Sequence, residues 1–130
     1  MMKQVFAVGK LSSAIEAKGI PLSAVTKGAG LVFVSGLPPL DVKTGELVRG
    51  DILVQTRQVL ENVKAALETA GSSLDKVLKT TVYIANAAYF ADVNRIYAEY
   101  FPSSPPARTF VTVGSWPWEF DIEIEAIALA

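Results

Sequence analysis

The sequence predicts an α+β fold in which one mixed sheet carries two helices on one face. Three observations lead to this expectation. The apolar pattern along the 130 residues gives the order strand, strand, helix, strand, helix, strand, strand. Both predicted helices are amphipathic, so each needs an apolar surface to cover, and a sheet face provides one. Neither an internal repeat nor a long linker divides the chain, which predicts a single domain over residues 1–130.

The first half contains a strand pair and the first helix. Residues 31–36 are β-branched and aromatic and follow a Gly-Ala-Gly turn, so they predict a strand that pairs with residues 25–27 as a hairpin. Asp51 is typical of a helix N-cap, and apolar residues recur after it at helical spacing until Gly71. We therefore expect a helix over residues 51–70.

The second half contains three strands and the second helix. Residues 77–84 alternate in character and predict a strand. A helix starts near Asn86, where aromatic and aliphatic side chains recur at steps of three and four up to Phe101. A proline-rich segment ends that helix. Two further strands, residues 108–113 and 121–128, are joined by a loop that contains both tryptophans.

The composition excludes several classes of function. Twelve Lys and Arg residues against 13 Asp and Glu give a formal net charge of −1 without a tract of like charge, which argues against nucleic acid as a partner. The sequence contains no histidine and no cysteine, which excludes histidine-dependent serine triads, thiol nucleophiles and zinc sites built from these residues. Any chemistry must use carboxylates, Arg, Lys, Tyr, hydroxyls, main-chain groups and water.

The apolar content predicts subunit contacts rather than a membrane segment. Residues 1–10 lack the apolar run of a signal peptide, and the longest uncharged stretch, residues 28–40, is broken by Gly and Pro. We expect a cytoplasmic protein with no membrane partner. Hydrophobic residues make up 51% of the chain, whereas a monomer of this size buries only about two thirds of its unfolded surface. The surplus is typical of a chain that packs against other subunits.

Arg108 stands out among the strand residues. Alternation places Arg108 and Phe110 on one face of their strand, and Glu123 and Glu125 on one face of the last strand. Because the opposite, more aliphatic sides suit the helices, we expect all four residues on the uncovered face, beneath other subunits. There the Arg108 guanidinium either binds a carboxylate ligand through two parallel hydrogen bonds or forms a cross-strand ion pair with Glu123 or Glu125.

Two weaker signals remain open. Trp116 and Trp118 either line the mouth of a pocket or cap the edge of the core. Asp41, Glu46 and Asp51 carry the oxygen ligands that Mg²⁺ prefers, but scattered turn carboxylates are more often solvent-facing. We therefore expect no metal site.

A series of short segments resembles the RidA/YjgF family and covers residues 21–128. Each segment alone is weak evidence, but their order and spacing together are specific. The segments are Phe33-Val34-Ser35-Gly36, Thr44-Gly45-Glu46, Gln55-Thr56-Arg57-Gln58, Ala70-Gly71-Ser72-Ser73-Leu74-Asp75, Lys79-Thr80-Thr81-Val82, Val93-Asn94, Pro106-Ala107-Arg108 and Ile122-Glu123-Ile124-Glu125-Ala126.

The resemblance implies a homotrimeric barrel of chorismate-mutase-like subunits with a ligand cleft between neighbours. It also implies hydrolysis of reactive enamine/imine intermediates to 2-oxo acids and ammonia, as by a 2-iminobutanoate/2-iminopropanoate deaminase, without a cofactor. By the same resemblance, Arg108 binds the substrate carboxylate and Glu123 positions the attacking water. Ser35, Gly36 and Asn94 are implied to line the cleft.

Three positions differ from the RidA-type members of that family. Leu22 stands where they carry a Tyr, Phe110 where many carry a Cys, and Trp116 where they carry a Leu. We expect Phe110 and Trp116 to contact the substrate in a more apolar pocket. A larger imino acid or a 2-aminomuconate-like enamine is therefore an alternative to 2-aminoacrylate. The alternative function is a trimeric binder that senses small carboxylates, such as 2-oxo acids, without turnover.

Overall fold

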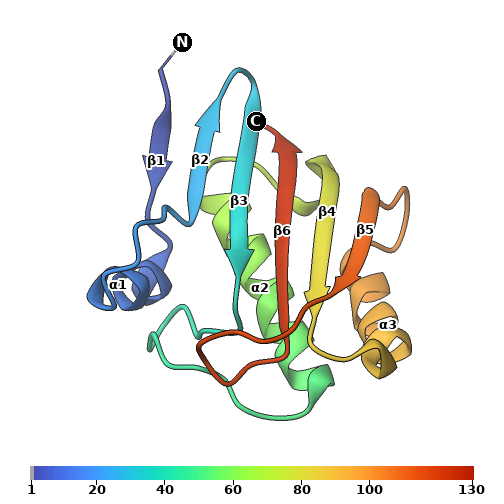
Figure 1. Ribbon diagram of the computed structural model, residues 1–130. Helices are drawn as coiled ribbons and strands as arrows, with labels where there is room; N and C mark the ends of the chain where they lie inside the picture. The colour runs from blue at the N-terminus through green and yellow to red at the C-terminus, as the bar shows by residue number, and fades with distance from the viewer. Residues whose placement is uncertain (1) are drawn as a thin grey trace.

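The computed structural model describes residues 2–130 and contains one six-stranded sheet in the order β1-β2-β3-β6-β4-β5 (Figure 1). Neighbouring strands are antiparallel except for β4 and β5, which are parallel, so the sheet is mixed, as the sequence predicts. The strands are β1 (Gln4–Phe6), β2 (Val25–Gly28), β3 (Leu31–Leu37), β4 (Val77–Ile84), β5 (Ala107–Thr112) and β6 (Ile122–Leu129).

The helices divide between one face and one end of the sheet. Figure 1 shows α2 and α3 behind the sheet, on the same face, and α1 beside the lower ends of β1 and β2. No helix of residues 2–130 covers the other face, which we call the uncovered face. The helices are α1 (Gly9–Ala17), α2 (Ile52–Thr69) and α3 (Phe90–Tyr100), with short 3-10 helices η1 (Leu74–Lys76) and η2 (Ala87–Tyr89).

Local sequence explains both ends of α2. The Asp51 carboxylate accepts a hydrogen bond from the Val54 N–H at 3.0 Å, which satisfies one of the open donors in the first turn. At the other end Ala70 caps the helix and Gly71 follows with a φ of 82°, a left-handed conformation that glycine adopts without strain. The predicted helix over residues 51–70 is confirmed to within one residue at each end.

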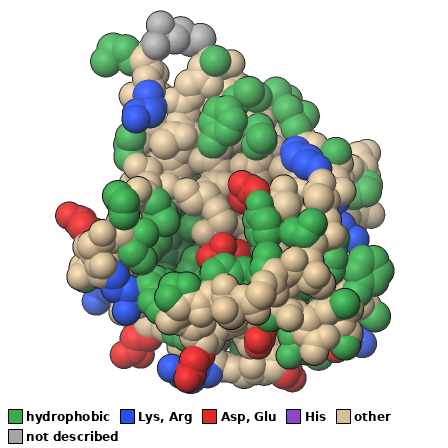
Figure 2. All heavy atoms as spheres, viewed as in Figure 1, with side chains coloured by type: hydrophobic (Ala, Val, Ile, Leu, Met, Phe, Trp, Pro, Cys, Tyr) green, Lys and Arg blue, Asp and Glu red, His purple; other side chains and the backbone are tan. Residues whose placement is uncertain are grey.

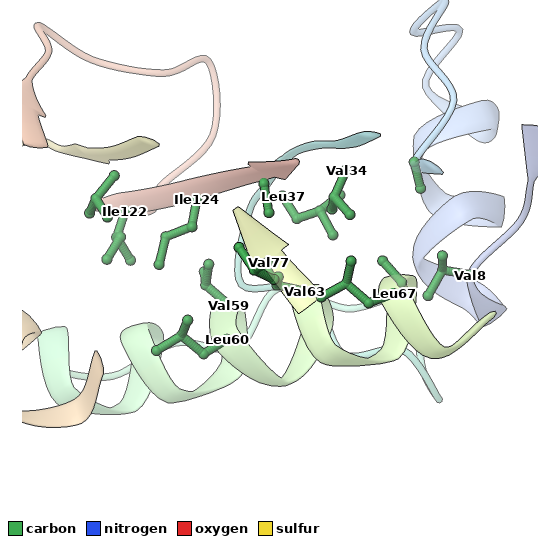
Figure 3. Packing of buried hydrophobic residues seen from close by; sticks show 14 of the residues in the cluster. Val8, Val34, Leu37, Val59, Leu60, Val63, Leu67, Val77, Ile122 and Ile124 are labelled. Carbon is green, nitrogen blue, oxygen red and sulfur yellow. The ribbon is translucent and has the colours of Figure 1, made fainter. Parts of the chain in front are cut away.

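The core lies between α2 and the sheet. Figure 3 shows Val59 and Val63 of α2 pointing toward Leu37 of β3 and Ile124 of β6. All four side chains are completely buried. Burial of an aliphatic side chain of this size stabilises the folded chain by about 1.5–3 kcal/mol. The aliphatic side of β6 therefore faces the helices, as its alternation predicts.

The predicted order of elements omitted β1 and α1. β1 has three residues and pairs with β2 at the sheet edge, so it carries too little alternation to be recognised. α1 begins after Val8, which makes no side-chain cap hydrogen bond, and it buries Leu11 and Ile15 alone of its nine residues. No helix within residues 2–130 is long and apolar enough to cross a membrane.

β3 contains an irregularity where it pairs with β6. The register shifts between Val34 and Leu37, and both side chains are buried. Residues three apart in a regular strand point to opposite faces, so the shift marks an inserted residue of the kind found in β-bulges. Ser35 and Gly36 occupy this irregular stretch next to β6.

Candidate active site

Arg108 and Glu123 lie on opposite faces of the sheet. Arg108 of β5 stands beside Thr80 of β4, which is completely buried under the helices. Glu123 of β6 stands beside Tyr83 of β4. Thr80 and Tyr83 are three positions apart in one strand and so point in opposite directions. The expectation that Arg108 and Phe110 share the uncovered face with the acidic residues is therefore wrong.

The reason lies in the position of β5 at the sheet edge. Aromatic side chains of α3 pack on the side of β5 that carries Arg108 and Phe110. Its other side carries Val111, which stands beside Tyr83 on the uncovered face and is 36% exposed. Aliphatic character therefore does not identify the helix-facing side of an edge strand, because another molecule can cover the exposed side.

The Arg108 guanidinium is held by an amide and surrounded by aromatic rings. Its Nη1 donates a hydrogen bond to Asn94 Oδ1 of α3 at 2.8 Å. The centroids of the Tyr97, Phe110 and Phe90 rings lie 4.9, 5.2 and 5.9 Å from its Cζ. Ring faces at these distances attract the cation and limit the orientations of the side chain. Arg108 is half-buried.

The Arg108 guanidinium has no acidic partner within its own subunit. Among residues 2–130, no Asp or Glu oxygen lies within 4.0 Å of its nitrogens. Glu123 and Glu125 are on the other face of the sheet, which excludes the cross-strand ion pair with either residue. An arginine carries five N–H donors, and the recorded bond to Asn94 engages one nitrogen. The guanidinium is therefore equipped to bind a planar anion through parallel hydrogen bonds.

Glu123 is a half-buried carboxyl group on the uncovered face. Burial raises its pKa from 4.5 to about 7, the nearby charge of Glu125 adds to this rise, and a hydrogen-bonding interaction with the Trp116 side chain opposes it. Glu125 itself accepts a hydrogen bond from the Tyr83 hydroxyl. With a pKa of about 7, Glu123 can both accept and return a proton at neutral pH.

Gly36 leaves space beside the Glu123 carboxyl group. A Cβ atom at Gly36 would lie 2.8 Å from Glu123 Oε1, closer than real Cβ contacts come. The two residues are therefore in direct proximity across β3 and β6.

A cavity of about 180 Å³, which we call the Glu123 pocket, adjoins the same two residues. Figure 2 shows the uncovered face with acidic side chains near its middle and a hollow beside them. Most of the pocket wall is apolar. It comes from Ile15, Ile20 and Leu22 in the N-terminal segment and from Trp116, Trp118 and Phe120 in the loop before β6.

The remaining predicted site residues fall into the same two groups. Asn94 and Phe110 lie with Arg108, while Gly36 and Trp116 lie with Glu123. Of the two interpretations left open for Trp116, the structure supports the one in which it lines a pocket.

Ser35 belongs to the framework of the site within this chain. Its hydroxyl donates to the Ser23 carbonyl oxygen at 2.6 Å, and its N–H donates to the Ala24 carbonyl oxygen at 2.9 Å. These bonds fasten the segment that carries Leu22 to β3. The Ser35 hydroxyl is therefore already engaged as a donor.

Sequence reasoning missed residues in both groups. Phe90 and Tyr97 belong to the apolar stripe that predicts the second helix, yet they flank Arg108. Phe90 is 48% exposed, so part of its ring surface is free. Ile15 and Ile20 line the Glu123 pocket from a region with no predicted element. The spacing of Leu11 and Ile15, four positions apart, is the signal that could have indicated a short helix there.

The fold and the divided site define a class of small α+β proteins with one mixed sheet. A solved structure from Yersinia pestis, described as a protein of unknown function of the conserved Rid protein family, superposes with a TM-score of 0.89. It is 40% identical, and the match covers 99% of this chain and all of that one. The family model described as Endoribonuclease L-PSP matches residues 11–130. The chain belongs to this family, which is the RidA/YjgF family.

Two curated relatives support the same membership. A RutC family protein from Pyrococcus horikoshii is 54% identical over 108 residues, which cover 83% of this chain and 86% of the relative. A protein named Reactive Intermediate Deaminase A, chloroplastic, from Arabidopsis thaliana is 43% identical over 108 residues, which cover 83% of this chain and 58% of the relative.

Proposed function

We propose that the protein hydrolyses reactive enamine/imine intermediates to 2-oxo acids and ammonia. One observation carries the proposal: the chain presents an arginine with no acidic partner in residues 2–130 on one face, and a carboxyl group with a pKa of about 7 on the other. The first suits a substrate carboxylate and the second suits proton transfer with water. The deaminase name of the Arabidopsis relative supports the same activity.

Because the two groups point away from each other, each complete site needs two subunits. The uncovered face exposes large apolar side chains: Val5 at 57%, Phe33 at 42% and Leu129 at 48%. An apolar surface of this kind favours burial against another molecule. We propose a homotrimer in which Arg108 of one subunit meets Glu123 of its neighbour around a threefold axis.

In this arrangement the Arg108 guanidinium holds the carboxylate of a 2-imino acid, and Asn94 fixes the orientation of the guanidinium. The imine carbon is already electrophilic, so orientation and an aligned water supply most of what the reaction needs. General acid–base assistance at such a step contributes typically about 10²–10⁴-fold in rate.

Glu123 relays protons between water and nitrogen. As the water oxygen bonds to the imine carbon, the carboxylate takes a water proton and passes it to the nitrogen that receives the C=N electron pair. The resulting amino alcohol loses its hydroxyl proton by the same route. The C–N bond then breaks with its electron pair on nitrogen, a C=O bond forms, and ammonia leaves. One imino acid and one water thus give one 2-oxo acid and one ammonia.

The proposal is tested with imino acids generated by an amino-acid oxidase, by timing the formation of 2-oxo acid and ammonia. Arg108→Ala is expected to lower kcat/KM about 100-fold or more, because it removes charge-assisted hydrogen bonds to the carboxylate. Arg95→Ala is the matched control, since Arg95 lies on the exposed surface of α3 and its ion pair among the described residues is with Asp92 of the same helix. Absence of any acceleration by the wild-type protein would reject hydrolysis. Binding of 2-oxo acids that depends on Arg108 would then indicate a sensor.

Gly36→Ala is expected to lower kcat/KM by about 100-fold, since catalysis loses about this much when a reacting group moves by about 1 Å. The added Cβ would force the Glu123 carboxyl group, 2.8 Å away, to move. Gly114→Ala is the control, because a Cβ there meets nothing within 4 Å. Thermal unfolding should show both variants folded. Equal activity of the two variants would contradict the assigned role of the Glu123 position.

A further inference from the structure

The Glu123 pocket lies beside the proposed reaction centre and is larger than the reaction itself requires. It measures about 180 Å³ and shares Glu123 and Gly36 with that centre. An apolar cavity of about 150 Å³ is enough to hold a benzene-sized group. A methyl substituent on the imine carbon would leave most of this volume unfilled.

The chemistry of the pocket wall restricts what can occupy it. Among the described residues that line it, Glu123 is the sole titratable side chain, and most of the others are aliphatic or aromatic. Leu22 has no hydroxyl that an apolar occupant would leave unpaired. A charged or strongly polar substituent would lose its hydration in this pocket without finding a partner, which is costly.

The wall of the pocket comes from two separate parts of the chain that contact each other. Ile15 comes from α1, whereas Trp116 and Trp118 come from the loop before β6. The Lys18 ammonium group, just after α1, lies 4.8 Å from the centroid of the Trp118 ring and links the two parts. Ser35 fastens the segment with Leu22 through its bond to the Ser23 carbonyl oxygen.

We propose that the Glu123 pocket binds the apolar side chain of the substrate, so that the protein prefers 2-imino acids with branched aliphatic or phenyl side chains. This inference rests on the proposed function, because the imine carbon must lie next to Glu123 for its substituent to enter the pocket. Such substrates are supplied by reactions that oxidise the amine of the corresponding α-amino acids. Leu22 and Ile20 are then specificity-determining residues.

The first experiment compares kcat/KM for imino acids generated from alanine, leucine and phenylalanine. A single methylene in an apolar pocket is worth about 10-fold or more, so the leucine and phenylalanine products should each exceed the alanine product by at least that factor. Leu22→Trp, which fills the pocket, should remove this preference, so that the ratio of kcat/KM for the leucine product to that for the alanine product falls to near one. Equal kcat/KM for all three substrates in the wild-type protein would overturn the inference.

Two further variants secure the comparison. Val54→Trp is the control. It adds a similar ring at an exposed position of α2, which lies on the opposite side of the sheet from Glu123, and it should keep the wild-type preference. Ile20→Ala widens the pocket and should lower kcat/KM for the leucine product by about 10-fold, which keeps the test valid if Leu22→Trp fails to fold. Unchanged selectivity in Ile20→Ala would count against the pocket.

A binding measurement separates failure of this inference from failure of the proposed function. Calorimetry should show 4-methyl-2-oxopentanoate binding about 10-fold or more tightly than pyruvate, and Leu22→Trp should abolish the difference. Selective binding without imine hydrolysis would support the ligand-binding role of the pocket and contradict the proposed hydrolase activity. Hydrolysis without selectivity would support the proposed hydrolase activity and contradict the ligand-binding role of the pocket. Neither hydrolysis nor selective binding would reject both.

Discussion

Two inactive variants, Arg108→Ala and Glu123→Gln, are expected to regain activity when their subunits are mixed in one assembly. The two side chains stand beside Thr80 and Tyr83 of β4 and therefore point to opposite faces of the sheet. In the homotrimer that we propose, Arg108 from one chain and Glu123 from the next would form each site. A mixed assembly contains some sites in which both wild-type residues meet.

The size of the recovery distinguishes a shared site from a site within one chain. For random mixing of equal amounts in a cyclic trimer, about a quarter of the sites receive both wild-type residues, so activity should rise to about a quarter of the wild-type value. The measurement is imine hydrolysis after the variants are co-refolded or co-expressed. Mixing the wild type with the Arg108→Ala/Glu123→Gln double variant provides a control, since about a quarter of its sites should also be intact. No recovery in the mixture of single variants would contradict the shared site.

The pH dependence of kcat/KM is expected to show a midpoint near pH 7, with about a tenfold loss per unit below it. Burial raises the pKa of Glu123 to about 7, and the carboxylate form is needed to accept a proton from water. In Glu123→Gln, the kcat/KM that remains should no longer fall as the pH drops below about 7. A wild-type profile that stays flat between pH 5 and 8 would contradict the assignment, because about 99% of a group with this pKa is protonated at pH 5.

The neighbours of Glu123 should move this midpoint in opposite directions. The Trp116 side chain lowers the pKa of Glu123, so Trp116→Phe should shift the midpoint upward. The charge of Glu125 raises the same pKa, so Glu125→Gln should shift the midpoint downward. Shifts of the same sign in both variants would show that another group controls the profile.

The raised pKa also affects folding stability with a definite sign. The folded state binds the Glu123 proton more tightly than the unfolded state, whose value is near 4.5. The resulting contribution to stability is fully present below about pH 4.5 and is lost as the pH rises to about 7. Glu123→Gln should therefore gain stability against denaturant relative to the wild type at pH 8, but not at pH 4.

Most of the sheet and its two covering helices could be predicted because their patterns are strong. The alternation of residues 77–84 matches β4 (Val77–Ile84), and Asp51 caps α2 as its side-chain chemistry predicts. β1 and α1 could not be predicted in the same way, since neither is long enough for a clear period. They are held in place by tertiary contacts, such as the pairing of Val5 with Thr26.

Candidate site residues could be proposed from the sequence, whereas their arrangement could not be predicted. Arg108 and Glu123 stand out because charges within apolar strands need a reason. Their separation on two faces depends on α3 packing against the edge strand, and alternation within one strand does not reveal which side a helix covers. The Glu123 pocket was beyond sequence reasoning, because Ile15 and Trp116 are far apart in the chain and meet only in the folded molecule.

The inserted residue in β3 gives this chain a constraint on length. Val34 and Leu37 are three positions apart and yet both reach the core, because the irregular stretch between them absorbs one extra residue, and Gly36 in this stretch lies beside Glu123. Deletion of one residue here would restore a regular ladder and leave Leu37 facing the core, but it would remove the irregular stretch that holds Gly36 beside Glu123. The core packing of β3 could therefore survive such a deletion, whereas the close approach of Gly36 to the Glu123 carboxyl group depends on the extra residue.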